Sequence, residues 1–479
     1  MQKIIEIKGG VARHPDYRLA APLDFELFKG EHLAICGPNG GGKTLLVDIL
    51  RSAHPLLGEG VKYDFGDEPG MISDRMQYVA FKDAEGEIPG SYYQQRWNHG
   101  DSPDYPTVES VIAPLLKNGF SGYDFLKAWG LDAIWKKELH CLSSGECRKY
   151  RLCKSLVRNP KLLLLDQPYI GLDRKSHEEF SDFLKMLADK MSIVIVVSRV
   201  EDIPECITHV VHVENKCVFP KVSREAYLAA HPVTRQQECF DGKKETGKPL
   251  SSDFVISLKS VTVSCLGHVL LDSLDWQVRK GECWALTGEN GAGKSTLLSV
   301  VCADNPAAYS NDVTLFGRRR GRGESIWDIK RRIGYVSPEL IRSYVKPLKV
   351  YEVVCSGCRD TVGLYGKPTE REMEQCRKWM SVFGIEEWAE RSFLTLSSGQ
   401  QRWVMLVRAF VKEPELLILD EPFQGLDRIY CSMAKNILNN YLSDGQHTLV
   451  MVTHDMSELP SCINHHLHLI KPSERRNLS

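Results

Sequence analysis

The sequence predicts an α/β protein made of two similar halves, each with a mixed or parallel sheet at its centre. Two observations support this prediction. The longest apolar runs, such as residues 161–165 and 192–197, have the length of buried strands. In addition, one set of short motifs occurs in the same order in both halves of the 479 residues. Such a repeat indicates two copies of one α/β domain.

Composition and charge restrict the possible function classes. Hydrophobic residues make up 43% of the chain and charged residues 26%, as in ordinary globular proteins. The formal net charge of −1 argues against a generally basic surface for nucleic acid. No apolar run approaches the ~18–20 residues of a membrane-spanning helix, and residues 1–8 resemble a strand and not an export signal. The 15 cysteines then suggest free thiols in a reducing compartment. We expect a cytoplasmic protein, with a peripheral position at the inner face of the cell membrane as an alternative.

Both halves contain the pattern G-x-x-x-x-G-K-[ST] between a strand-like and a helix-like segment. Glycines let such a loop wrap around phosphates, the lysine neutralises charge, and the hydroxyl ligates Mg²⁺. The predicted phosphate-binding residues of the first half are Gly37, Pro38, Asn39, Gly40, Gly41, Gly42, Lys43 and Thr44. Those of the second half are Gly288, Glu289, Asn290, Gly291, Ala292, Gly293, Lys294, Ser295 and Thr296.

Two further motifs follow each loop at nearly constant spacing. Leu-Ser-Ser-Gly contributes Ser143, Ser144 and Gly145 in the first half, and Ser397, Ser398 and Gly399 in the second. An apolar strand then ends at Asp166 and again at Asp420. A parallel sheet would hold these two carboxylates beside the phosphate-binding loops, where each can reach Mg²⁺.

Together these motifs resemble those of ATP-binding cassettes (ABC), two in one chain. The segment 311–337 resembles, more narrowly, the ModF/PhrA family of soluble two-cassette proteins associated with molybdate transport. The resemblance implies two P-loop nucleotide-binding domains, 1–232 and 253–479, joined by a polar linker, 233–252. Each domain would carry an antiparallel β subdomain before its P-loop and a helical subdomain ahead of its signature. ATP and Mg²⁺ are the implied cofactors, and hydrolysis of ATP to ADP and phosphate is the implied reaction.

The resemblance also implies an intramolecular, head-to-tail pair of cassettes with no obligate homo-oligomer. Each ATP would lie between one P-loop and the opposite signature. The implied metal ligands are Thr44 and Asp166 in one site and Ser295 and Asp420 in the other.

The two predicted sites differ where hydrolysis would occur. Glu421 follows Asp420 at the position that polarises the attacking water in the family, and His454 stands at the switch-histidine position. The first half has Gln167 and Arg199 instead. An amide cannot accept a proton, and loss of a general base typically costs ~10²–10⁴-fold in rate. We therefore predict that catalysis depends on Glu421 and His454 and that the first site is degenerate.

Other positions depart from the family pattern or are explained by packing or solvent exposure without a functional role. Phe81 and Pro338 replace the glutamine that usually ends the Tyr-Val-x-Gln strand, which puts ordinary coupling to a permease in doubt. Tyr17 and Cys265 occupy the adenine-stacking region without a clear match. The pair Cys355 and Cys358 has metal-ligand spacing, but we interpret it as part of a packed helix. For the basic run 318–332 we favour a solvated surface over a phosphate-binding one.

Two function classes remain open. The first is an ATPase component or accessory of molybdate or oxyanion transport, with a separate transmembrane permease as its partner. The second is a non-transport clamp that acts on nucleic acid or the ribosome. The predicted linker is short and polar, whereas tandem-cassette translation factors carry a long charged helix there, so the first class is favoured.

Overall fold

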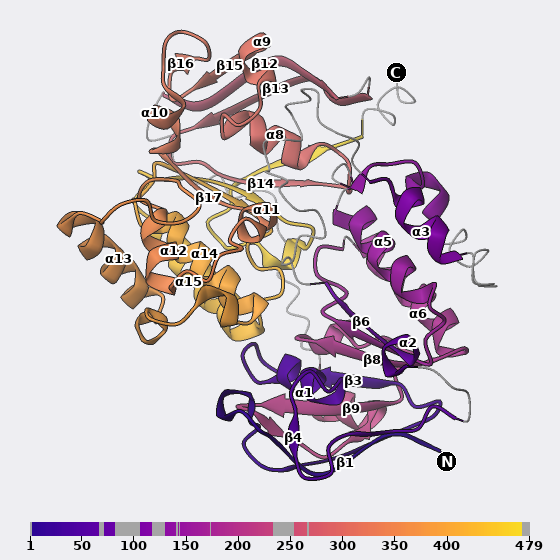
Figure 1. Cartoon of the computed structure of the whole chain (residues 1–479). Helices are drawn as coiled ribbons and strands as arrows, with labels where there is room; N and C mark the ends of the chain where they lie inside the picture. Colours follow the sequence, from indigo (N-terminus) through magenta and orange to yellow (C-terminus); the bar gives the residue numbers. More distant parts are fainter. Residues whose placement is uncertain are drawn as a thin grey trace. The chain divides into compact units, whose positions relative to one another are not determined.

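The computed structural model describes residues 2–66, 71–81, 106–116, 130–139, 142, 144–172, 174–232, 253–265 and 268–471. The described residues up to 232 form one compact unit, the first unit, and those from 253 onward form another, the second unit (Figure 1). Residues 233–252, the predicted linker, lie outside the described residues. The exact domain boundaries therefore stay a prediction.

Each unit contains a parallel sheet with the same order of strands. In the second unit the order is β17 (Ile333–Val336), β18 (Leu416–Asp420), β19 (Thr448–Val452), β14 (Cys283–Gly288) and β20 (His465–Leu469). In the first unit it is β6 (Met76–Ala80), β7 (Leu162–Asp166), β8 (Ser192–Val197), β3 (Leu33–Cys36) and β9 (His209–Glu214). Two short antiparallel strands, β10 (Cys217–Val218) and β11 (Val222–Ser223), pair with β9. In both units the strand that precedes the P-loop, β3 or β14, lies between two parallel neighbours. One neighbour, β8 or β19, ends near the switch position, and the other is β9 or β20.

A separate antiparallel sheet is present in each unit, as predicted, but its strands do not all precede the P-loop. The first unit pairs β1 (Lys3–Ala12) with β2 (Leu23–Phe28), and then with β4 (Leu56–Leu57) and β5 (Lys62–Tyr63). The second unit pairs β12 (Phe254–Cys265) with β13 (His268–Arg279) and β15 (Asp312–Leu315), and β15 with β16 (Arg318–Arg319). Both sheets are thus completed by strands that follow the P-loop helix. The prediction was incomplete on this point because two-residue strands leave no periodic signal.

Helices surround the sheets. In the first unit they are α1 (Lys43–Leu50), α2 (Ile72–Arg75), α3 (Val108–Leu116), α5 (Ser144–Leu156), α6 (Arg174–Ala188) and α7 (Arg224–Ala230), with 3₁₀ turns η1 (Pro15–Tyr17), η3 (Leu131–Ile134) and η5 (Val200–Asp202). In the second unit they are α8 (Lys294–Val301), α9 (Ala307–Ser310), α10 (Ile326–Lys330), α11 (Pro338–Arg342), α12 (Val350–Ser356), α13 (Glu370–Val382), α14 (Ser398–Phe410) and α15 (Arg428–Leu442), with η6 (Glu386–Trp388), η7 (Phe393–Thr395) and η8 (Met456–Glu458). The helical layer ahead of the second signature, α12 and α13, confirms the predicted helical subdomain there.

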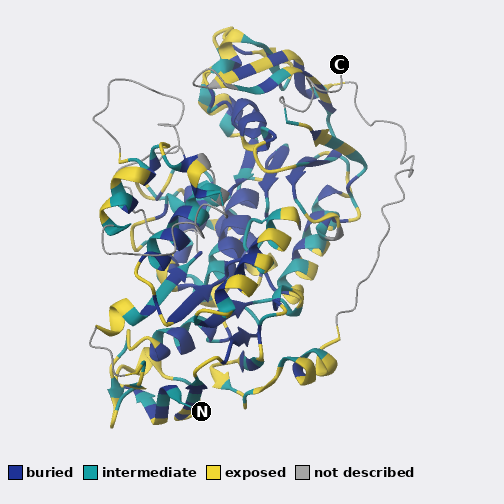
Figure 2. Cartoon of the chain, turned by 90° about the vertical axis from the view of Figure 1, so that its right-hand side faces the viewer, coloured by how far each residue is buried: buried dark blue, intermediate teal, exposed yellow. Residues whose placement is uncertain are grey.

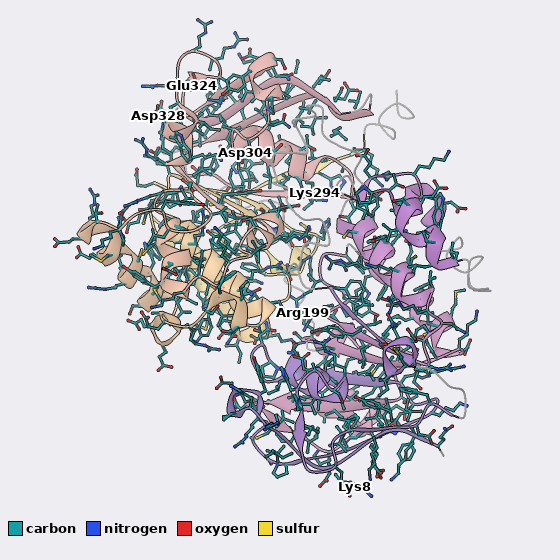
Figure 3. The ribbon with its side chains drawn as sticks, viewed as in Figure 1. Lys8, Arg199, Lys294, Asp304, Glu324 and Asp328 are labelled. Atoms are coloured by element: carbon teal, nitrogen blue, oxygen red, sulfur yellow. The ribbon has the colours of Figure 1, made fainter. Side chains whose placement is uncertain are left out.

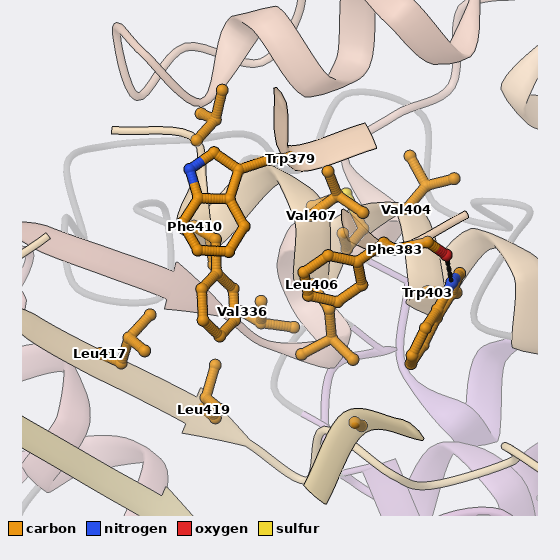
Figure 4. Packing of buried hydrophobic residues seen from close by; sticks show 14 of the residues in the cluster. Val336, Trp379, Phe383, Trp403, Val404, Leu406, Val407, Phe410, Leu417 and Leu419 are labelled. Atoms are coloured by element: carbon orange, nitrogen blue, oxygen red, sulfur yellow. Dashed lines mark hydrogen bonds between the residues drawn. The ribbon is translucent and has the colours of Figure 1, made fainter. Parts of the chain in front are cut away.

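The parallel sheet of the second unit is buried on both faces, because α8 and the antiparallel sheet cover one face and α12 to α15 the other (Figures 1 and 2). Alternation along β18 sets the two cores: Leu416 and Ile418 pack on the first side, Leu417 and Leu419 on the second. On the second side, the indole of Trp403 donates to the carbonyl of Phe383 over 3.0 Å (Figure 4). Aromatic side chains from α13 and α14 fill this layer, which anchors the signature helix to the sheet.

Candidate functional site

The P-loops follow β3 and β14 and lead directly into α1 and α8, as the motif predicts. The backbone runs very close to the neighbouring strand there. A Cβ on Gly37 would lie 2.1 Å from the carbonyl oxygen of Val213, and one on Gly288 would lie 2.4 Å from that of Leu469. Gly42 and Gly293 cap the two helices with φ of +104° and +94°, a conformation that favours glycine. These glycines are therefore required by the fold of the loop itself.

The P-loop lysines are buried and lie in the concave side of their own loops. Lys43 Nζ donates to the carbonyls of Gly37 (2.6 Å) and Pro38 (2.8 Å), and Lys294 Nζ donates to those of Gly288 (2.7 Å) and Glu289 (2.9 Å). Figure 3 shows Lys294 at the start of α8. Carbonyls at equivalent positions of the two P-loops thus hold the lysine ammonium group in each unit. Phosphate oxygens of a bound nucleotide can take the place of these carbonyls as partners.

In the first unit a hydroxyl network surrounds Asp166 at the end of β7. Oδ2 of Asp166 accepts hydrogen bonds from Thr44 Oγ1 (3.2 Å) and Tyr78 Oη (3.1 Å). Burial and the charge of Asp166 raise the pKa of Tyr78 well above its usual range, so the phenol remains a donor. The guanidinium of Arg51 lies 4.3 Å from the centre of the Tyr78 ring. The predicted metal ligands Thr44 and Asp166 are therefore adjacent, and Tyr78 is a neighbour that sequence reasoning missed.

In the second unit, carboxylates gather where Mg²⁺ is expected. Burial raises the pKa of Asp420 well above its usual range, and the negative charges of Glu339 and Glu421 add to the effect. Glu339 is the second residue of α11, directly after Pro338, and sequence reasoning did not select it. Hard oxygen ligands with excess negative charge are what a divalent cation binds and neutralises. This donor set fits Mg²⁺, which would be held by Asp420 together with the hydroxyl of Ser295.

Glu421 and His454, the two predicted catalytic residues, are in direct contact. His454 Nε2 lies 2.8 Å from Oε1 of Glu421, and Gln424 Nε2 donates to Oε2 over 2.6 Å. Arg402 Nη1 in turn donates to the side-chain oxygen of Gln424 (3.1 Å). Burial disfavours the charged form of Glu421, but the hydrogen bond and charge of His454 outweigh it and lower the pKa. The carboxylate is therefore ionised and oriented from both sides.

The first unit has a different chain of contacts at the same positions. Gln167 Nε2 donates to Ser198 Oγ (2.8 Å), which donates to Oδ1 of the P-loop residue Asn39 (3.0 Å). Ile170 occupies the position of Gln424 and has no polar side-chain atom. Gln167 and Glu421 both have positive φ, 57° and 49°, so the two strand ends share the same unusual turn. The geometry of the position is thus retained in the first unit while its acid–base chemistry is absent.

The second signature lies at the start of a helix, as predicted. Ser397 is the N-cap of α14; its hydroxyl accepts from the amide of Gln400 (3.3 Å), and its own amide donates to Gln400 Oε1 (3.0 Å). Ser398 and Gly399 therefore form the first turn of the helix, where the backbone amides have no partner within the helix itself. In the first unit α5 begins at Ser144. Ser143 and the side chain of Ser144 lie outside the described residues, and nothing further is described for Gly145.

The departures from the family pattern have distinct structural settings. Phe81 is buried against Phe180, with ring centres 6.3 Å apart. Pro338 is the first residue of α11, whose N-cap is Ser337. Tyr17 is partly exposed and stacks on His54, with ring centres 3.8 Å apart. The Cys265 side chain lies outside the described residues.

Comparisons with known proteins agree with this geometry. The ABC transporter family model matches residues 20–169 and again residues 271–424. The chain belongs to the ABC transporter family. It is similar to the ABC transporter ATP-binding protein ModF of Escherichia coli, at 33% identity over 97% of this chain and 96% of that protein. It is also similar to two uncharacterized ABC transporter ATP-binding proteins, one of Schizosaccharomyces pombe (32%; 93% and 94% of the two chains) and one of Saccharomyces cerevisiae (26%; 94% and 92%).

Membership of this family makes the chain a tandem-cassette ATPase, and the described residues of each family match belong to one of the two units. Each match includes a P-loop and the strand that ends in Asp166 or Asp420. None of the helices in the described part of the chain combines the length and the apolar character that are needed to cross a bilayer.

Proposed function

We propose that this ABC ATPase hydrolyses ATP mainly at the P-loop of the second unit, with Mg²⁺ as cofactor. The observation that carries the proposal is the contact between Glu421 and His454, with Gln424 on the other carboxylate oxygen. Glu421 would orient the attacking water and accept its proton. His454 would stabilise the charge that develops on the γ-phosphate. Lys294 and the loop amides would bind the phosphates, and Asp420 and Ser295 would hold the metal ion.

The first unit supports a different role in the same proposal. Lys43 is held by carbonyls equivalent to those that hold Lys294, and Thr44 contacts Asp166, so this unit should bind Mg-ATP. Gln167 is held by Ser198 and can position water, but it cannot accept a proton. We propose that the first site retains nucleotide and contributes little turnover. The head-to-tail pairing of the cassettes is part of this proposal.

The experiment that tests the site assignment compares two matched variants of the full chain. Glu421→Gln should lower ATP turnover ~10²-fold or more and leave ATP binding intact, because only the base is removed. Gln167→Ala, the matched change in the first unit, should alter turnover by less than about twofold. Equal losses in both variants, or wild-type turnover in Glu421→Gln, would show that the second site does not dominate.

We propose further that the chain is an accessory of molybdate or other oxyanion transport, in association with a separate permease at the membrane. The similarity to ModF over nearly the whole length supports this. Phe81 and Pro338 in place of the usual glutamines mean that coupling to a permease would differ from the common mode. A tagged chain purified from native membranes should recover a permease; recovery of ribosomes or nucleic acid in its place would favour the clamp alternative.

A further inference from the structure

A group of three thiols lies in the helical layer of the second unit, and ATP hydrolysis does not use it. Cys355 is in α12, Cys376 is in α13, and Cys358 follows the end of α12. The Sγ atoms of Cys355 and Cys376 are hydrogen bonded at 2.8 Å, and these two side chains are 1% and 0% exposed. Cys358 is partly exposed and also forms a hydrogen bond with Cys376. The spacing of Cys355 and Cys358 suggested only a packed helix, because Cys376 is distant in sequence.

We propose that Cys355 and Cys376 are a reversible oxidation site that forms a disulfide with a hydroperoxide as oxidant. The sulfur of Cys355 attacks one peroxide oxygen, the O–O bond breaks, and the leaving oxygen departs as water or alcohol. This leaves a sulfenic acid on Cys355. The sulfur of Cys376 then attacks that sulfur; the S–O bond breaks, and hydroxide leaves with the Cys376 proton as water. With hydrogen peroxide, two thiols and one peroxide give one disulfide and two waters, and a dithiol reductant reverses the change.

The surroundings of Cys355 favour it as the attacking thiol. Hydrogen bonds with Cys376 and with the hydroxyl of Tyr351 lower the pKa of Cys355, although burial opposes this. Interactions with Cys355 and Cys358, together with burial, raise the pKa of Cys376, which suits the resolving thiol. Tyr351, which contacts Cys355, and Cys358, which contacts Cys376, are both partly exposed. A small peroxide therefore has a short path to the site.

An ion pair between side chains positions the two helices without a disulfide. Arg359, directly after Cys358, forms a two-point ion pair with Glu372 in the first turn of α13, with distances of 2.9 and 2.8 Å. Disulfide formation would bring the sulfur atoms from 2.8 Å to ~2.05 Å, a change that side-chain rotation can supply. Reduced and oxidised forms can therefore share one fold.

The cross-link would act close to the signature helix. Ser356, the neighbour of Cys355, accepts a hydrogen bond from the guanidinium of Arg408 on α14 (3.2 Å). Joining α12 to α13 restricts the unfolded chain between residues 355 and 376, which predicts a rise of about 10 °C in the melting temperature of the second unit. Oxidation would thus stiffen the layer that carries Ser398 and Gly399.

The test uses the full chain and hydrogen peroxide, followed by alkylation, digestion and mass spectrometry. We expect a peptide that links Cys355 to Cys376, formed at least ~10-fold faster than oxidation of the exposed Cys217 and lost with dithiothreitol. Cys358→Ala should keep this cross-link. Cys376→Ala should remove it and leave a sulfenic acid on Cys355 that dimedone traps.

Two outcomes would overturn the proposal, and both are read in the wild-type chain, so they do not depend on folding of a variant. One is full alkylation of Cys355 and Cys376 after Cys217 has been oxidised. The other is a cross-link that joins Cys358 to Cys376 while Cys355 is still reduced.

Discussion

Replacing Glu372 by glutamine should destabilise the start of α13 at neutral pH. The hydrogen bond with Arg359 lowers the pKa of Glu372 from 4.5 to about 2, and burial only partly opposes this. At 1.36 kcal/mol per pH unit, such a carboxylate would favour the folded state by at most ~3.4 kcal/mol. The Arg359 side chain is 32% exposed, so solvent screening reduces the expected contribution to about 1–2 kcal/mol. Glutamine can still accept from the Thr369 amide, so the substitution removes the charge and keeps the cap.

Backbone hydrogen exchange of the peptide that covers α13, followed by mass spectrometry, measures this local stability directly. A loss of 1–2 kcal/mol corresponds to exchange that is about 5- to 30-fold faster at pH 7. Because the pKa is lower in the folded state, the stabilisation is present above pH 4.5 and is lost as the pH falls toward 2. The difference between wild type and variant should shrink accordingly below pH 4.5. Glu370→Gln, an exposed neighbour in the same turn, is the control. A difference that is independent of pH, or equal in the control, would refute the role of the ion pair.

Two further predictions concern the first site. Loading the Glu421→Gln chain with Mg-ATP should leave two nucleotides per chain. Adding Lys43→Ala should reduce the number to one, because it removes the phosphate-binding ammonium group. An unchanged number would show that the first P-loop does not bind nucleotide. In the same Glu421→Gln background, Gln167→Glu alone should not restore turnover, because an arginine (Arg199) stands at the switch-histidine position; Gln167→Glu with Arg199→His should gain more than the two single changes together. Return to the wild-type rate with Gln167→Glu alone would show that Arg199 does not help to silence the site.

The motifs could be predicted from the sequence because each is local. A P-loop requires only a strand, a turn and a helix in succession, so the positions of Lys43 and Lys294 follow from a few adjacent residues. The same holds for Asp166 and Asp420 at strand ends. The contact between Glu421 and His454 joins the ends of two parallel neighbours, β18 and β19, and the family resemblance predicted the role of each residue but not this contact. The structure brings the two side chains together.

Other contacts could not be predicted because they join distant segments through side chains. Nothing in the local sequence indicates that Tyr78 bonds to Asp166, or that the charge of Glu339 acts on Asp420. The basic run 318–332 is a second example. Arg320 is buried and pairs with Glu324 at 2.6 Å, and Lys330 pairs with Asp304 at 2.6 Å. Part of this run therefore stabilises the fold, and only part of it is a solvated surface, as the sequence had suggested for the whole.

The differences between the two sites are concentrated on one function. Both units keep the loop that binds phosphate, the lysine held by the same two carbonyls, and the unusual positive φ after the strand-end aspartate. They differ at the residues that would handle the proton of the attacking water, where Glu421 and His454 correspond to Gln167 and Arg199. ATP binding and ATP hydrolysis can be lost separately. Backbone amides and a lysine bind the phosphates, whereas a single carboxylate acts as the general base. Under the proposed function, the chain would therefore hold two nucleotides and hydrolyse one of them, and the first site would act as a long-lived ATP-bound element.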